Sequence, residues 1–135
     1  MITTQTPLIA QFYDLDPMGV VWHGHYTRFL EEARCTLLDH IGYNYSEMKM
    51  SSFIWPIVDM RIKYVRPIKF HQAFIVSATL VEYINRLKID YVITDATSQE
   101  VLTKASTVQV AVDAETTELC LESPAILIQK VEGLL

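Results

Sequence analysis

Apolar side chains recur every three to four positions between residues 25 and 41, in the longest periodic stretch of the chain. The apolar positions are Tyr26, Phe29, Leu30, Ala33, Leu37, Leu38 and Ile41. A spacing close to 3.6 residues predicts one long amphipathic helix over 25–41. Gly42 follows the last periodic position and His40 lies in the last turn, and both are typical of a helix C-terminus.

A period of two replaces the helical period after residue 57. Val58, Met60, Ile62 and Tyr64 alternate with Asp59, Arg61 and Lys63. This alternation predicts a strand with one buried face, which Pro67 ends. Similar patterns predict strands at about 73–84, 86–95 and 100–113, and a short apolar strand at 7–13 precedes the helix.

Short polar turns at 85–86 and 95–99 bring consecutive strands close enough to pair antiparallel. The segment from Ser123 onward fits either a short helix or a last strand, and Pro124 favours the helix. A strand, one long helix and four strands predict an α+β fold in which the sheet wraps around the helix. The length of 135 residues suits a single domain over 1–135. Because such a sheet keeps two edges and a second face, we expect a homo-oligomer.

Composition narrows the classes of function. Hydrophobic residues make up 50% of the chain and charged residues 20%, which indicates a folded protein. The formal charge of −5 argues against nucleic-acid binding. Cys35 and Cys120 make no disulfide framework, and we predict two free thiols. No signal sequence or long apolar segment is present, so we expect a cytoplasmic protein with no membrane span.

The stretch from Asp14 to Tyr26 carries the candidate chemistry, because it leads through a tight turn into the predicted helix. A helix N-terminus presents unpaired N–H groups and roughly half a positive charge. Such a terminus can bind a developing oxyanion while a nearby carboxylate attacks or activates water. The arrangement predicts acyl transfer.

The residues of this stretch resemble a known family. Asp16-Pro17-Met18-Gly19-Val20-Val21-Trp22-His23, then Tyr26, and Phe29 to Arg34 on the helix are similar to the hotdog-fold acyl-CoA thioesterases of the 4-hydroxybenzoyl-CoA thioesterase and YbgC-like family. Tyr64-Val65-Arg66-Pro67 resembles the end of the family's second strand. One departure is His71-Gln72, where relatives usually place acidic residues.

The resemblance implies a hotdog fold and hydrolysis of an acyl-CoA, or of an acyl-carrier-protein thioester, with no cofactor or metal. It makes Asp16 the catalytic carboxylate and the backbone N–H of His23 the group that polarises the thioester carbonyl. Asp16 then attacks the thioester or serves as a base for water, and the sequence leaves both routes open. Substrate contacts are expected at Gly19, Val20, Trp22, Tyr26, Arg66 and Lys69. The expected assembly is a dimer of dimers, with residues of a second subunit completing each site.

Other roles for these residues stay open. Asp16 could cap the following turn, Asp14 fits a structural turn residue, and Glu31 or Glu32 could be the essential carboxylate. His23 and His25 with the two aspartates have the residue types of a metal site, but neighbouring positions do not ensure convergence.

Arg61, Lys63, Arg66 and Lys69 fall within nine positions. They form either the solvated face of a strand or a seat for the phosphates of coenzyme A, with Arg86 and Lys88 as further candidates.

Rival functions separate on the same residues. The Asp14-Leu15-Asp16 pattern does not indicate a haloacid-dehalogenase phosphatase, because the chain lacks strand–helix alternation. Pro17 and Met18 break a calcium loop of the EF-hand type. A hotdog dehydratase pairs a turn histidine with a helix carboxylate, whereas this turn holds Asp16, which favours hydrolysis. A non-catalytic module that binds acyl-CoA or acyl-carrier protein is the remaining alternative.

Overall fold

The computed structural model describes residues 1–135 and contains seven strands and three α-helices. The strands are β1 (Thr3–Ile9), β2 (Phe53–Ile54), β3 (Ile57–Tyr64), β4 (Ala73–Glu82), β5 (Leu87–Asp95), β6 (Val101–Gln109) and β7 (Val112–Asp113). The helices are α1 (Tyr26–Ile41), α2 (Tyr45–Met50) and α3 (Ala125–Glu132). Two 3₁₀ turns, at Phe12–Asp14 and His23–His25, precede α1.

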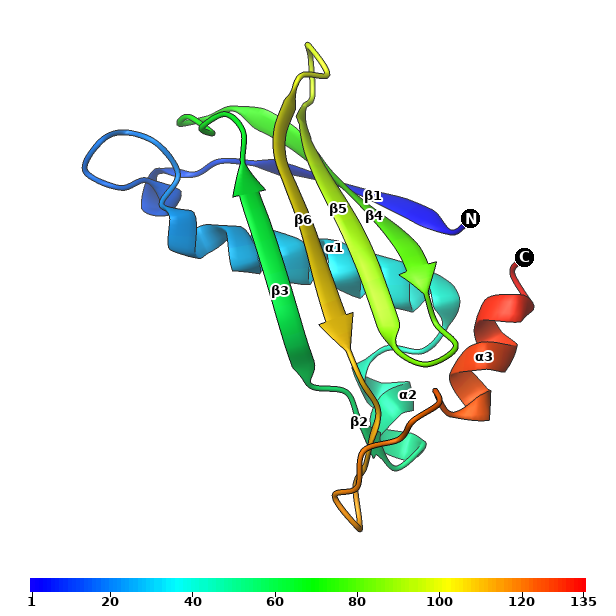
Figure 1. Ribbon diagram of the computed structural model, residues 1–135. Coiled ribbons are helices and arrows are strands. Elements are labelled where there is room, and N and C mark those ends of the chain that lie inside the picture. The colour runs from blue at the N-terminus through cyan, green and yellow to red at the C-terminus, as the bar shows by residue number, and fades with distance from the viewer.

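Five strands form one antiparallel sheet in the order β1-β4-β5-β6-β3. Figure 1 shows α1 lying across one face of this sheet, which curves around the helix. Every second residue of β4 is buried, as expected for a strand with one face on the core, and these residues are Phe74, Val76, Ala78 and Leu80. The rings of Phe29 on α1 and Phe74 on β4 are 5.0 Å apart. The predicted α+β fold, with the sheet wrapped around one long helix, is confirmed.

The long helix follows its sequence pattern closely. All seven of the apolar positions that predicted it are buried against the sheet. Gly42 ends α1 at a φ of +84°, and its N–H donates to the carbonyl oxygens of Leu38 and Asp39 at 3.0 and 3.1 Å. The left-handed conformation explains why glycine stands there.

Some predicted boundaries are wrong. The first strand lies at Thr3–Ile9 rather than 7–13, because the chain leaves the sheet after Ala10 and exposes the rings of Phe12 and Tyr13. The strand predicted over 100–113 ends at Gln109, and β7 pairs instead with β2 in a separate two-stranded ribbon. The C-terminal segment, for which the sequence allowed either a helix or a strand, forms helix α3 directly after Pro124.

Strand pairing departs from sequence order at both edges of the sheet. β3 pairs with β6 and β1 pairs with β4, although β4 follows β3 along the chain. Helix α2 was not predicted, although Asn44 and Glu47 form a capping box in which the Asn44 N–H donates to Glu47 Oε1 at 2.9 Å. None of the helices has both the length and the apolar character needed to cross a membrane.

Candidate active site

The residues Asp16 to Gly19 form a tight turn at the tip of a short hairpin that leads into α1. The Gly19 N–H donates to the Asp16 carbonyl oxygen at 3.0 Å, and the Asp16 N–H donates to the Val20 carbonyl oxygen at 2.8 Å. Pro17 suits the second position of such a turn because its φ is fixed, and Gly19 has a φ of +81°. No other atom lies within 4 Å of a Cβ built at Gly19, so conformation rather than space requires glycine.

The Asp16 carboxylate has one bonded and one free oxygen. Its Oδ1 accepts the N–H of Met18 at 2.8 Å and the N–H of Val20 at 3.4 Å, whereas no protein group donates to Oδ2. The side chain is half-buried. Asp16 therefore orders its own turn, and it does not cap α1. The free oxygen can still accept a proton from water or attack an electrophile.

Backbone donors without a protein acceptor lie just before α1. The N–H groups of His23 and Gly24 donate to no atom of the chain, and both residues are exposed. The carbonyl oxygen of His23 accepts the hydroxyl of Tyr64 at 3.1 Å, which ties this turn to the end of β3. Free N–H groups at the start of a helix are suited to hold an oxyanion.

Gly24 is a site residue that sequence reasoning missed. A Cβ at this position would lie 2.4 Å from Cζ3 of Trp22, because the indole ring covers the Gly24 backbone. The indole also contacts the rings of His23 and His25, at centroid distances of 5.2 and 5.3 Å. The feature of the sequence that could have indicated this role is the position of Gly24 between His23 and His25.

The aromatic candidates differ in burial. The Trp22 side chain is 46% exposed, whereas Tyr26 and Phe29 are almost fully buried. Burial raises the pKa of the Tyr26 hydroxyl above its usual value, so it stays a neutral hydrogen-bonding group. Its ring packs edge-on to Tyr64, with 4.8 Å between the centroids. In the single chain only Trp22 of these three can be reached from outside.

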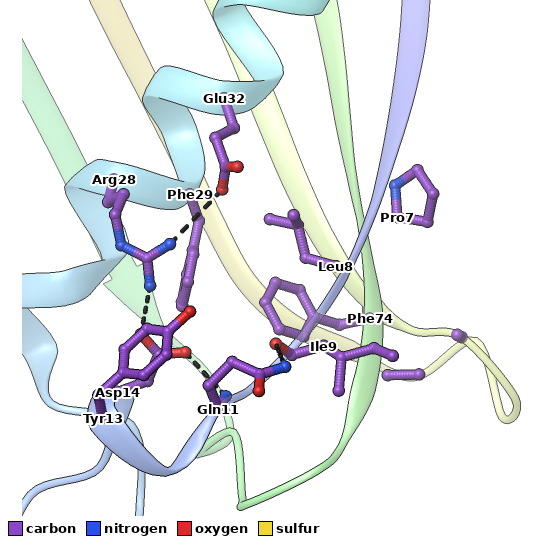
Figure 2. Close-up of a pocket in the computed structure, with 12 residues that line it drawn as sticks. Pro7, Leu8, Ile9, Gln11, Tyr13, Asp14, Arg28, Phe29, Glu32 and Phe74 are labelled. Carbon is purple, nitrogen blue, oxygen red and sulfur yellow. Dashed lines mark hydrogen bonds and ion pairs between the residues drawn. The ribbon is translucent and has the colours of Figure 1, made fainter.

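Asp14 has surroundings unlike those of Asp16. Its side chain is 1% exposed and forms an ion pair with Arg28, on the first turn of α1. Figure 2 shows Arg28 reaching from the helix to Asp14, beside a cavity of about 510 Å³ that the apolar side chains of Leu8, Phe29 and Phe74 also line. No local pattern in the sequence indicates this pair, because its members are fourteen positions apart.

The two glutamates of α1 are paired with arginines. Glu31 accepts from Arg34, and Glu32 lies 3.7 Å from Arg28, four residues earlier on the same helix. Across the chain, no three histidine, cysteine, aspartate or glutamate side chains are grouped closely enough to hold a metal ion. Cys35 and Cys120 are both unpaired thiols.

The basic residues do not form one cluster. Arg66 and Lys69 line a cavity of about 510 Å³ beyond the end of β3, and Lys69 pairs with Val20 in an isolated bridge. Arg61 and Lys63 line a different cavity with residues of β5 and β6. Arg86 pairs with Glu82 at 2.8 Å in the hairpin between β4 and β5. Among these basic residues, Lys69 is the one that pairs with the hairpin that carries Asp16.

The fold and the site together are typical of one class of protein. A sheet wrapped around one helix carries a turn carboxylate shortly before a helix start with free N–H groups, and this arrangement suits hydrolysis of an acyl thioester. Residues 10–129 match the thioesterase-like superfamily, and the chain belongs to this family.

Individual relatives and solved structures support this family assignment. YneP of Bacillus subtilis, named as a candidate acyl-CoA thioesterase, is 27% identical over 83 residues, which are 62% of this chain and 60% of YneP. A DHNA-CoA thioesterase from Staphylococcus aureus is 26% identical with a TM-score of 0.84, covering 99% of this chain and 93% of that one. A 4-hydroxybenzoyl CoA thioesterase superposes with a TM-score of 0.83 at 17% identity, covering 96% and 98%. The predicted resemblance is confirmed. The chain's matches span 49–60% of the length of the curated relatives.

Proposed function

We propose that this protein hydrolyses the thioester of an acyl-CoA to a free acid and coenzyme A, as one hotdog domain. The observation that carries the proposal is the free Oδ2 of Asp16 in a turn that leads to the unpaired N–H groups of His23 and Gly24. Asp16 pairs across the hairpin with Val20, three residues before His23, which corresponds to roughly 10 Å of backbone. The Asp16 side chain and a thioester carbonyl whose oxygen lies on the N–H groups together bridge this separation.

The site residues have distinct parts in the reaction. The N–H of His23 stabilises the negative charge that develops on the thioester oxygen. The Asp16 carboxylate either adds to the carbonyl carbon and expels the thiolate, leaving an anhydride that water hydrolyses, or takes a proton from the attacking water. In both routes one water is consumed, the C–S bond breaks, and the acid and the thiol are released. Trp22 shields this position from one side. Lys69 offers charge to the phosphates of coenzyme A, and Arg66 adds to it by exchanging its exposed ion pair with Glu100, at 3.5 Å, for a phosphate.

We also propose that two copies pair through the free edge of β3. The other sheet edge, β1, carries Pro7, which cannot donate to a partner strand, whereas β3 exposes the apolar side chains of Val58 and Tyr64. Since Tyr64 contacts His23, a strand added there lies next to the helix start, and the partner contributes to the site. A dimer of dimers extends this unit. Sedimentation velocity combined with activity tests the idea, and a fully active monomer would refute it.

Thiol release from short, long and aromatic acyl-CoAs and from acyl-carrier-protein thioesters tests the function. Asp16→Asn keeps the shape of the side chain and removes its charge, so we expect kcat to fall by at least about 100-fold. Asp113→Asn is the matched control, because Asp113 Oδ1 also accepts two turn N–H groups, at 2.9 and 3.0 Å, far from the helix start. Equal activity of both folded variants would refute the role of Asp16. Binding without turnover by the wild type would indicate a binding module.

A further inference from the structure

Asp14 is the only charged side chain among the buried residues, and the proposed chemistry does not use it. A carboxylate loses its hydration when it is buried, which is unfavourable unless charges and hydrogen bonds replace the lost water. Its two oxygens are both occupied. Oδ1 accepts from the Arg28 guanidinium, and Oδ2 accepts the N–H of Gln11 at 2.8 Å.

Arg28 is held from several directions. Its guanidinium carbon lies 5.0 Å from the centroid of the Phe29 ring and 5.9 Å from that of Tyr13, and Glu32 is 3.7 Å away. In Figure 2 the guanidinium lies between the carboxylates of Asp14 and Glu32, with the Tyr13 ring beside Asp14. Arg28 thus has a fixed position on the first turn of α1.

The backbone of Asp14 forms the base of the hairpin that carries Asp16. The Asp14 carbonyl oxygen accepts the Trp22 N–H at 2.9 Å, and the next bonded pair along the hairpin joins Asp16 and Val20. Trp22 directly precedes His23 with its free N–H. The ion pair therefore connects the helix start to the residue that closes the base of the hairpin.

We propose that Asp14 and Arg28 are a positioning pair that holds the Asp16 carboxylate in register with the N–H of His23. This proposal rests on the proposed thioesterase function. Asp14 is too buried to touch a substrate, so it acts through the hairpin. Because a displacement of about 1 Å between reacting groups lowers a rate on the order of 100-fold, the pair affects kcat far more than KM.

Kinetics of Asp14→Asn, Arg28→Met and Arg28→Lys test the pair. We expect Asp14→Asn and Arg28→Met to lower kcat by roughly 10–100-fold, with KM within about threefold of the wild type. Arg28→Lys keeps the charge and should recover part of kcat, and the double variant Asp14→Asn/Arg28→Met should be no worse than either single variant. Glu82→Gln, which breaks the exposed Glu82–Arg86 pair at 2.8 Å, is the matched control with unchanged kcat.

A second measurement tests the positioning role of Asp14 and Arg28 separately from the proposed thioesterase activity. The amide signals of His23 and Gly24 in ¹H–¹⁵N NMR spectra should shift or broaden in Asp14→Asn and Arg28→Met, and stay in place in Glu82→Gln. A wild type inactive on every thioester would overturn the function, while the amide signals still decide the positioning role. Unchanged kcat and unmoved amide signals in the folded variants would overturn the pair. If Asp14→Asn is unfolded by circular dichroism, Arg28→Lys and Arg28→Met decide the outcome.

Discussion

Replacing Gly19 with alanine should destabilise the protein through backbone conformation alone. Gly19 has a φ of +81°, and nothing lies within 4 Å of an added Cβ. An L-residue in the left-handed region costs roughly 1–2 kcal/mol. The smaller conformational freedom of alanine in the unfolded chain offsets roughly 0.4–1 kcal/mol of this. The net loss is therefore about 1 kcal/mol, or roughly 3–5 °C in Tm for a chain of this length.

Chemical denaturation of Gly19→Ala, Gly19→Asn and the wild type measures this loss. Asparagine tolerates the left-handed region better than alanine, so Gly19→Asn should lose about half as much. Gly24→Ala is a useful comparison, because its added Cβ would lie 2.4 Å from the Trp22 ring without a left-handed φ. Trp22 is half-exposed and can turn away, so Gly24→Ala should alter tryptophan fluorescence more than stability.

The ranking of the Gly19 variants tests whether backbone strain governs the stability of this turn. If alanine and asparagine both leave the free energy of unfolding within about 0.3 kcal/mol of the wild type, backbone strain does not govern this turn. If alanine costs more than about 3 kcal/mol, a steric contact must contribute that the open space around Gly19 does not contain. The kcat of Gly19→Ala should fall as well, because the same turn holds the Asp16 carboxylate.

Two further predictions concern residues away from the proposed site. The N–H of Ser98 and then the side-chain amide of Gln72 lower the pKa of Asp95 from 3.8 to about 2, so its contribution to stability is complete above about pH 3.8 and is lost as the pH falls toward 2. Asp95→Asn should therefore show a flatter loss of stability over this range in urea denaturation at stepped pH, and a slope equal to that of the wild type would contradict the assignment. Tyr91→Phe removes the buried partner of Thr107 Oγ1 at 2.8 Å and should cost about 1–2 kcal/mol in thermal unfolding; an unchanged Tm would show that the bond adds no net stability.

Part of the candidate site is local in sequence and was predictable. Pro17 and Gly19 encode the turn on both sides of Met18, and the helix start follows within a few residues, so the order of carboxylate, turn and helix is set by near neighbours. The buried partner of Asp14 was not predictable, because Arg28 meets it only after the hairpin folds back on α1. The four basic residues that lie close together in the sequence are divided between two cavities for a similar reason. Arg61 and Lys63 lie on β3, whereas Arg66 and Lys69 follow its end and line a different cavity.

The periodic elements follow from local patterns in the sequence. The apolar positions of α1, the glycine that ends it and the alternation along β4 depend on contacts within a few residues, and their spacing records them directly. The buried face predicted for β3 is correct only for Met60 and Ile62, which are half-buried, because Val58 lies at a register shift between Ile57 and Asp59 and is exposed, as is Tyr64 at the strand end. The pairing of the strands follows instead from long-range contacts in the folded protein. β3 joins β6 across an intervening hairpin, and the short β7 leaves the sheet to join β2, because strand pairing depends on distant residues that no local pattern records. The burial of Asp14 likewise depends on a residue distant in sequence, because a buried carboxylate needs a charged partner, here the Arg28 guanidinium, in place of its lost hydration.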